Sequence, residues 1–139
     1  DVHAVVDWYG PTDLSQMDDC PKIERKTSGR GDARSAFIGG PVDENKIITQ
    51  MANPITHLNS NTPPFLIFHG AKDTSVPVCQ SEILHNAMIN KGLSSKLIIE
   101  EEGVHSGTNK KMFAQKNIDM MTEFIIDQYN KSKASVFSN

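Results

Sequence analysis

The apolar residues of the chain gather in three short runs, each followed closely by a glycine. The runs cover residues 4–9, 65–69 and 97–100, and the glycines are Gly10, Gly70 and Gly103. The second run is continuously apolar, which is typical of a strand covered on both faces. Because helical patterns or a long excursion separate the runs, the sequence predicts parallel β-α-β units and an open α/β sheet of about three strands.

Two longer segments show helical spacing of their apolar residues. Residues 78–90 predict one helix, with Gly92 as its stop signal. Residues 109–129 predict a long amphipathic helix, and residues 131–139 lose the pattern and are predicted to fray. The positions expected to face inward are Ile83, Leu84, Ala87 and Met88 in the first helix, and Ala114, Ile118, Met121, Ile125 and Tyr129 in the second.

The segment between the first two strands, residues 11–62, is polar and rich in glycine. It contains two short helical patterns, at residues 33–38 and 43–51, and Ile47, Ile48 and Met51 are expected to form the inward face of the second. An insertion of this length between neighbouring strands usually has a function. We therefore interpret residues 11–62 as a lid or pocket wall within one domain that covers residues 1–139.

Composition excludes several classes of function. The 139 residues include 37% hydrophobic and 22% charged residues and carry a formal charge of −3, without a basic stripe, so nucleic acid is not an expected partner. The apolar runs are too short to span a bilayer. The histidines and cysteines lack metal-ligand spacing, so neither a metal nor another cofactor is expected. Cys20 and Cys79 are expected to be free thiols, with a single disulfide as the alternative.

An aspartate and a histidine follow the ends of the second and third strands. Ligands of open α/β sheets bind beyond the carboxyl ends of the strands, so Asp73 and His105 are expected to meet there. A carboxylate that orients an imidazole serves to activate a nucleophile. In the alternative interpretation, Asp73 caps the helix that begins near Pro77 and His105 lies in a surface turn.

Three further residues are candidates for contact with a substrate. Trp8 and Tyr9 end the first strand, where they could line a pocket or belong to the core. Val76 lies in the loop of Asp73 and is the third candidate.

Several separated segments resemble esterases and lipases of the acetylxylan and feruloyl esterase type, within the α/β-hydrolase superfamily. The segments are AVVDWYGPTDL, FIGGPVDENK, ANPITHL, PPFLIFHGAKDTSVP and IIEEEGVHSG. By this resemblance Asp73 is the acid and His105 the base of a catalytic triad. Relatives often carry a glycine directly after the histidine, where this chain has Ser106, a change that affects the turn and not the chemistry.

The resemblance also implies that part of the triad is missing. In this fold the residues come in the order serine, acid, histidine, with the serine in a G-x-S-x-G turn, and the chain contains no such motif. It therefore resembles the C-terminal half of an α/β-hydrolase, from the sixth of eight strands onward. A missing N-terminal half, or self-association, is the expected partner.

The function implied is hydrolysis of carboxylic esters without a cofactor, and acylated polysaccharide is the expected substrate. The isolated chain is predicted to be inactive, because it lacks the nucleophile. The alternatives are half of a prolyl-oligopeptidase-type peptidase, and an inert fragment that associates with itself. No feature of the sequence indicates a cellular compartment.

Overall fold

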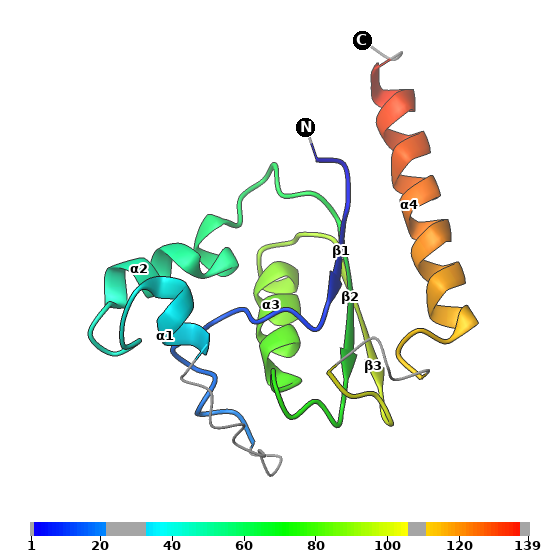
Figure 1. Cartoon of the computed structure of the whole chain (residues 1–139). Coiled ribbons are helices and arrows are strands. Elements are labelled where there is room, and N and C mark those ends of the chain that lie inside the picture. Colours follow the sequence, from blue (N-terminus) through cyan, green and yellow to red (C-terminus); the bar gives the residue numbers. More distant parts are fainter. Residues whose placement is uncertain (1, 22–32, 106–110, 137–139) are drawn as a thin grey trace.

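The computed structural model describes residues 2–21, 33–105 and 111–136. Strands β1 (Val5–Trp8), β2 (Phe65–Gly70) and β3 (Ser95–Glu100) form a parallel sheet in the order β1-β2-β3 (Figure 1). Phe68 of β2 pairs with Trp8 on one side and with Ile98 on the other. The three strands therefore end at the same edge of the sheet, and their following loops emerge side by side.

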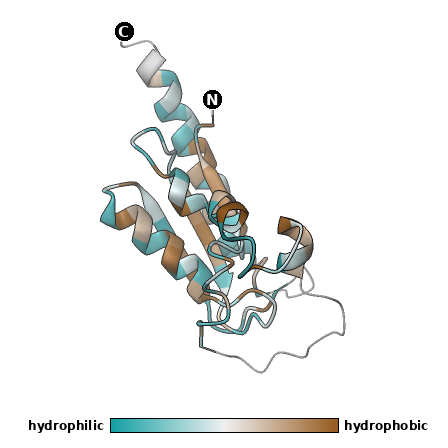
Figure 2. Cartoon of the chain, turned by 90° about the vertical axis from the view of Figure 1, so that its left-hand side faces the viewer, coloured by the Kyte–Doolittle hydropathy of each residue, from teal (hydrophilic) through white to brown (hydrophobic). Residues whose placement is uncertain are grey.

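Two helices cover the sheet, one on each face (Figure 1). Helix α3 (Cys79–Asn90) packs through Leu84 and Met88 against Ile67 of β2. Helix α4 (Gln115–Val136) lies on the opposite face, where its first half packs near Leu66 and Phe68. Since both faces of β2 are covered, its residues from Leu66 to Gly70 are buried. Figure 2 shows the result as hydrophobic bands along the central strands.

Helix α4 differs from the expected helix in its length and in its packed face. It packs through Met120, Met121 and Phe124, whereas Ile125 and Tyr129 are 46% and 52% exposed. Only the first half of α4 lies against the sheet, and its second half extends past the starts of the strands (Figure 1). The apolar pattern of α4 therefore continues past the part of the helix that packs on the sheet within the described residues.

The predicted fraying of residues 131–139 is wrong as far as Val136, where α4 ends; residues 137–139 lie outside the described residues. Side-chain pairs one turn apart support the last turns. Lys131 Nζ lies 2.6 Å from Asp127 Oδ2, and Lys133 Nζ lies 4.8 Å from the centre of the Tyr129 ring.

The excursion between β1 and β2 carries helices α1 (Ala33–Ile38) and α2 (Lys46–Ala52) and the 3-10 helix η1 (Pro54–His57). The expected inward face of α2 is wrong: Ile47, Ile48 and Met51 are 76%, 48% and 67% exposed. Thr49 is buried instead, and Ala52 packs near α1. The two smaller residues share one face of a helix that begins at Lys46, and that face allows a close approach.

The expectation of two free thiols is also wrong. Cys20 and Cys79 form a disulfide that joins the excursion to the start of α3. Within the described residues, no group of three or more His, Cys, Asp or Glu side chains is placed to hold a metal ion. No helix in that part of the chain has the length and apolar character needed to cross a membrane.

Candidate active site

Two glycines bring the loops after β2 and β3 into contact. A Cβ atom on Gly70 would lie 2.3 Å from the carbonyl carbon of Gly103, so a side chain there would force the two backbones apart. The Ala71 N–H donates to the Glu100 carbonyl at 2.9 Å, and the Lys72 N–H donates to the Gly103 carbonyl at 2.8 Å. These contacts place the two loops side by side at the carboxyl ends of their strands.

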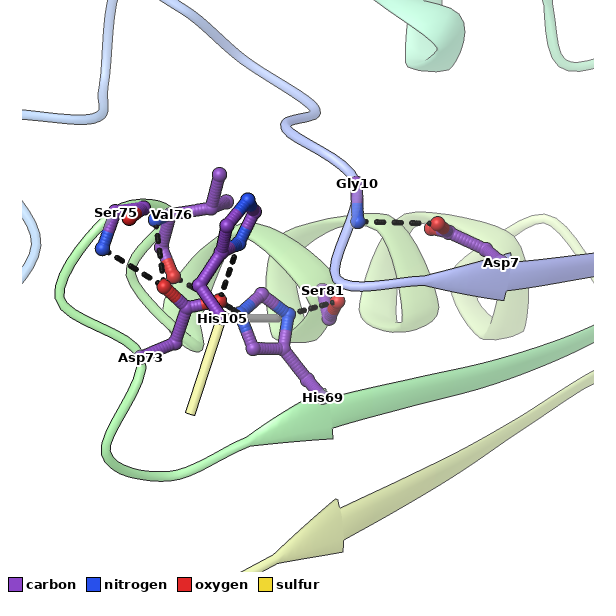
Figure 3. Close-up of polar contacts among 8 residues, drawn as sticks. All are labelled: Asp7, Gly10, His69, Asp73, Ser75, Val76, Ser81 and His105. Atoms are coloured by element: carbon purple, nitrogen blue, oxygen red, sulfur yellow. Dashed lines mark hydrogen bonds and ion pairs between the residues drawn. The ribbon is translucent and has the colours of Figure 1, made fainter. Parts of the chain in front are cut away.

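Asp73 and His105 meet across these loops. His105 Nδ1 lies 2.8 Å from Asp73 Oδ2, as the sequence predicts for residues at these strand ends (Figure 3). The Asp73 side chain is fully buried, whereas that of His105 is 34% exposed. An ionised carboxylate only accepts hydrogen bonds, so Nδ1 of His105 carries the proton and its Nε2 lone pair remains available as a base.

Backbone and side-chain donors keep the Asp73 carboxylate ionised. Its Oδ1 atom accepts hydrogen bonds from the backbone N–H groups of Ser75 and Val76, at 2.8 and 2.9 Å. Burial by itself raises the pKa of Asp73, but hydrogen bonds from His69, Val76, Ser75 and His105 together outweigh burial and hold the pKa below 3.8. Asp73 is thus charged at neutral pH, as a group that stabilises an imidazolium must be.

A second imidazole, His69, lies beneath this carboxylate. Its Nδ1 atom is 2.6 Å from Ser81 Oγ and its Nε2 atom is 2.9 Å from the Val76 carbonyl oxygen (Figure 3). With the proton on Nε2, the ring shares it between the Val76 carbonyl and the more distant Asp73 Oδ2, at 3.4 Å, and accepts from the Ser81 hydroxyl. His69 is completely buried, so every polar atom of the ring has a partner, as burial requires.

Sequence reasoning did not assign His69 or Ser81 to the site. A histidine directly before a strand-ending glycine reads as a packed residue, and Ser81 reads as an ordinary helix position. The available signal is that His69 precedes the acid by four residues, which in a tight loop can place the two side chains together.

The three candidate substrate-binding residues lie in different surroundings. Trp8 stacks between Phe68 and Phe113, with ring centroids 4.3 and 4.8 Å away. The Tyr9 ring lies against the His105 ring, with centroids 4.7 Å apart. Val76 is buried under the excursion, in a cluster with Leu14, Met17 and Ile38. Tyr9 thus contacts the ring of the proposed base, and contact with substrate stays a prediction for all three residues.

The excursion is anchored next to the acid loop. Gln80, on the first turn of α3, accepts hydrogen bonds at its Oε1 atom from the backbone N–H groups of Thr12 and Asp13, at 2.9 and 2.7 Å. The disulfide between Cys20 and Cys79 adds a covalent link beside it. The sequence indicated the disulfide only as an alternative and did not indicate the Gln80 contacts, because the partners lie 59 positions apart in the disulfide and 67 and 68 in the hydrogen bonds.

Comparison with known proteins shows that this chain is similar to esterases. Residues 1–88 match the family model described as BD-FAE. Esterase LipQ of Mycobacterium tuberculosis is 27% identical over 104 residues, which cover 75% of this chain and 24% of LipQ.

Two solved structures are also similar. A truncated form of a carbohydrate esterase from gut microbiota has a TM-score of 0.78 and 30% identity, over 91% of this chain and 42% of that chain. The bifunctional GH43-CE protein of Bacteroides eggerthii has a TM-score of 0.75 and 31% identity, over 90% of this chain and 15% of that chain. The chain therefore spans less than half the length of each relative named here. The predicted fold, a partial α/β-hydrolase with three parallel strands and flanking helices, is confirmed.

Proposed function

The chain belongs to the BD-FAE family and is an esterase-like hydrolase by homology, and from this premise we propose that it supplies the acid and the base of a serine-type carboxylic ester hydrolase. One observation carries the proposal. Asp73 is buried and ionised, and it accepts a hydrogen bond from Nδ1 of His105, whose ring is part-exposed. A carboxylate in this position fixes the tautomer of the base and stabilises its protonated form.

The chemistry assigned to the pair is acyl transfer. His105 Nε2 takes the proton of a serine hydroxyl while the serine oxygen bonds to the acyl carbon. The bond from that carbon to the alcohol oxygen then breaks, and Nε2 returns the proton to the leaving alcohol. Water repeats the sequence on the acyl-serine, which releases the carboxylic acid and restores the hydroxyl. Asp73 remains ionised throughout.

The nucleophile in this proposal comes from residues outside the 139 of this chain. The absence of a G-x-S-x-G motif from the sequence and the partial coverage of the relatives both support this assignment. In the α/β-hydrolase order, serine precedes acid and histidine. We assign the serine and the oxyanion donors to a preceding N-terminal half, and we expect the 139 residues alone to be inactive.

The substrate class that we propose is acylated polysaccharide, in which an ester bond joins the acyl group to a sugar hydroxyl. Two similar solved structures support this proposal, because one is a carbohydrate esterase and the other a GH43-CE protein, and both are at least 30% identical to this chain. The excursion would form a wall of the binding site, because Gln80 and the disulfide hold it beside the acid loop.

A fusion tests the proposal. The nucleophile-bearing N-terminal part of the gut carbohydrate esterase is joined ahead of this chain, which replaces the matching part of that relative. We expect the fusion to hydrolyse an aryl acetate and to release acetate from acetylated xylan, whereas the 139 residues alone do not. His105→Ala should lower kcat by about 10⁴-fold to 10⁶-fold, and Asp73→Asn by about 10⁴-fold.

Matched controls separate these roles from unspecific damage. His3→Ala and Asp127→Asn change an exposed histidine and an exposed aspartate outside the excursion, and both should retain full turnover. A folded fusion without ester hydrolysis would contradict the proposal and favour an inert fragment. Cleavage of a prolyl peptide without ester turnover would favour the peptidase alternative.

A further inference from the structure

Tyr9 occupies a strained backbone conformation directly after β1. Its φ angle is +50°, and it is the one non-glycine residue with positive φ in the described part of the chain. A side chain in the left-handed region is disfavoured by steric repulsion, most of all for a bulky residue. Such a conformation persists only where the surroundings hold it in place, and it often marks a functional site.

Hydrogen bonds hold the turn on both sides of Tyr9. The Tyr9 N–H donates to the Phe68 carbonyl at 2.8 Å, so the residue is still tied to β2. The next residue, Gly10, donates its N–H to Asp7 Oδ1 at 3.1 Å (Figure 3). A Cβ atom on Gly10 would lie 2.6 Å from that oxygen, so a side chain there would displace the Asp7 carboxylate. The strained backbone of Tyr9 is therefore held in place by the hydrogen bonds of its neighbours.

The turn places the Tyr9 ring against the His105 ring. The Tyr9 and His105 centroids are 4.7 Å apart and their planes are inclined by 58°, a tilted arrangement that aromatic pairs favour. Among the described residues, Asp73 holds the His105 ring by one hydrogen bond, at Nδ1. The Tyr9 ring adds a second contact, which narrows the range of orientations open to the imidazole.

We propose that Tyr9 is a positioning residue for His105. Its ring, held by the strained turn, keeps the imidazole in line with Asp73, so that Nε2 points to the nucleophile. The inference rests on the proposed function only in its kinetic consequence. The contact itself, and its effect on the His105 tautomer, belong to the 139 residues alone.

Three substitutions separate the ring from the turn. Tyr9→Phe keeps the ring. Tyr9→Asn removes it but tolerates the left-handed backbone, so the turn is retained. Tyr9→Leu also removes the ring and preserves apolar packing against the cluster of Leu66 and Phe68, which provides a folded variant should Tyr9→Asn fail to fold.

The first readout is the tautomer of His105 in the 139-residue chain, measured by long-range ¹H–¹⁵N NMR. We expect the Nδ1–H tautomer alone in the wild type and in Tyr9→Phe. Tyr9→Asn and Tyr9→Leu should show a mixture of tautomers, although their melting profiles remain cooperative. A uniform Nδ1–H tautomer in both ring-free variants would overturn the proposal, and this result does not depend on any esterase activity.

The second readout is turnover of the fusion. Loss of the ring should lower kcat by on the order of tenfold to a hundredfold with little change in KM, because the base is misplaced. Wild-type kcat in the ring-free variants would overturn the proposal. So would an effect confined to KM, which would make Tyr9 a substrate contact. If the wild-type fusion is itself inactive, the proposed function fails and the tautomer measurement alone decides the role of Tyr9.

Discussion

His69 and His105 approach the same oxygen of Asp73. Nε2 of His69 lies 3.4 Å from Oδ2, the atom that accepts the 2.8 Å hydrogen bond from His105. One imidazole is fully buried and the other is open to solvent on one side. The buried ring fixes the carboxylate from below, so that the exposed ring meets an acceptor of fixed orientation.

Replacement of His69 tests this arrangement. His69→Gln should lower the free energy of unfolding by about 2–3 kcal/mol, because the Val76 carbonyl and the Ser81 hydroxyl lose partners inside the core. Urea denaturation measures the change, with His57→Gln on the exposed 3-10 helix as the control. A loss no larger than that of the control would show that the buried ring is replaceable.

The lowered pKa of Asp73 makes the free energy of unfolding depend on pH in the acidic range. Because its folded pKa is below 3.8, Asp73 contributes stability that is present above the pKa of the unfolded chain and is lost as pH falls through the folded pKa. The difference in unfolding free energy between wild type and Asp73→Asn should therefore begin to shrink as pH approaches 3.8 from above and continue to shrink below it. Equal slopes for the two proteins over that range would contradict the assignment.

The ionised carboxylate of Asp7 should contribute to stability with the opposite sign to that of Asp73. Burial raises the pKa of Asp7 above 3.8, and the hydrogen bond from the Gly10 N–H offsets only part of that rise. The ionised form is thus penalised in the folded state, fully above the folded pKa and not at all below the unfolded one. Asp7→Asn keeps an acceptor for Gly10, so it should stabilise the chain at pH 7, and thermal melts should show that gain vanish below about pH 3.8.

Removal of the disulfide is predicted to cause a larger loss of stability. It joins residues 59 positions apart, and closure of a loop of that length in the unfolded chain is worth about 4 kcal/mol. The double variant Cys20→Ala, Cys79→Ala should lose about this amount in urea denaturation. Wild type in reductant serves as the control and should match the variant. Unchanged unfolding in both would show that the bridge does not form in solution.

The strands and the Asp73–His105 pair could be predicted because each depends on local rules. A continuous apolar run gives a buried strand, and parallel strands deliver their following loops to one edge of the sheet. These rules need no knowledge of distant partners. They predicted that Asp73 and His105 meet, as the 2.8 Å distance confirms, although the family resemblance was needed to prefer this over a helix cap and a surface turn.

The features that could not be predicted depend on partners distant in sequence. The buried side of α2 is chosen by its contact with α1, so Thr49 is inside while Ile47 is outside. The pairing of Cys20 with Cys79 requires the excursion to fold back on α3. The strain at Tyr9 follows from bonds to β2 and to Asp7, which no spacing of residues announces.

The close approach of Gly70 and Gly103 sets an order of events during folding. Parallel strands need a crossover connection, and between β2 and β3 this connection is α3, so the chain must cross one face of the sheet for these two backbones to touch. Contacts of that sequence separation form slowly compared with a helix. We therefore expect the Asp73–His105 hydrogen bond to form late, so that its NMR signal reports the completion of folding instead of its beginning.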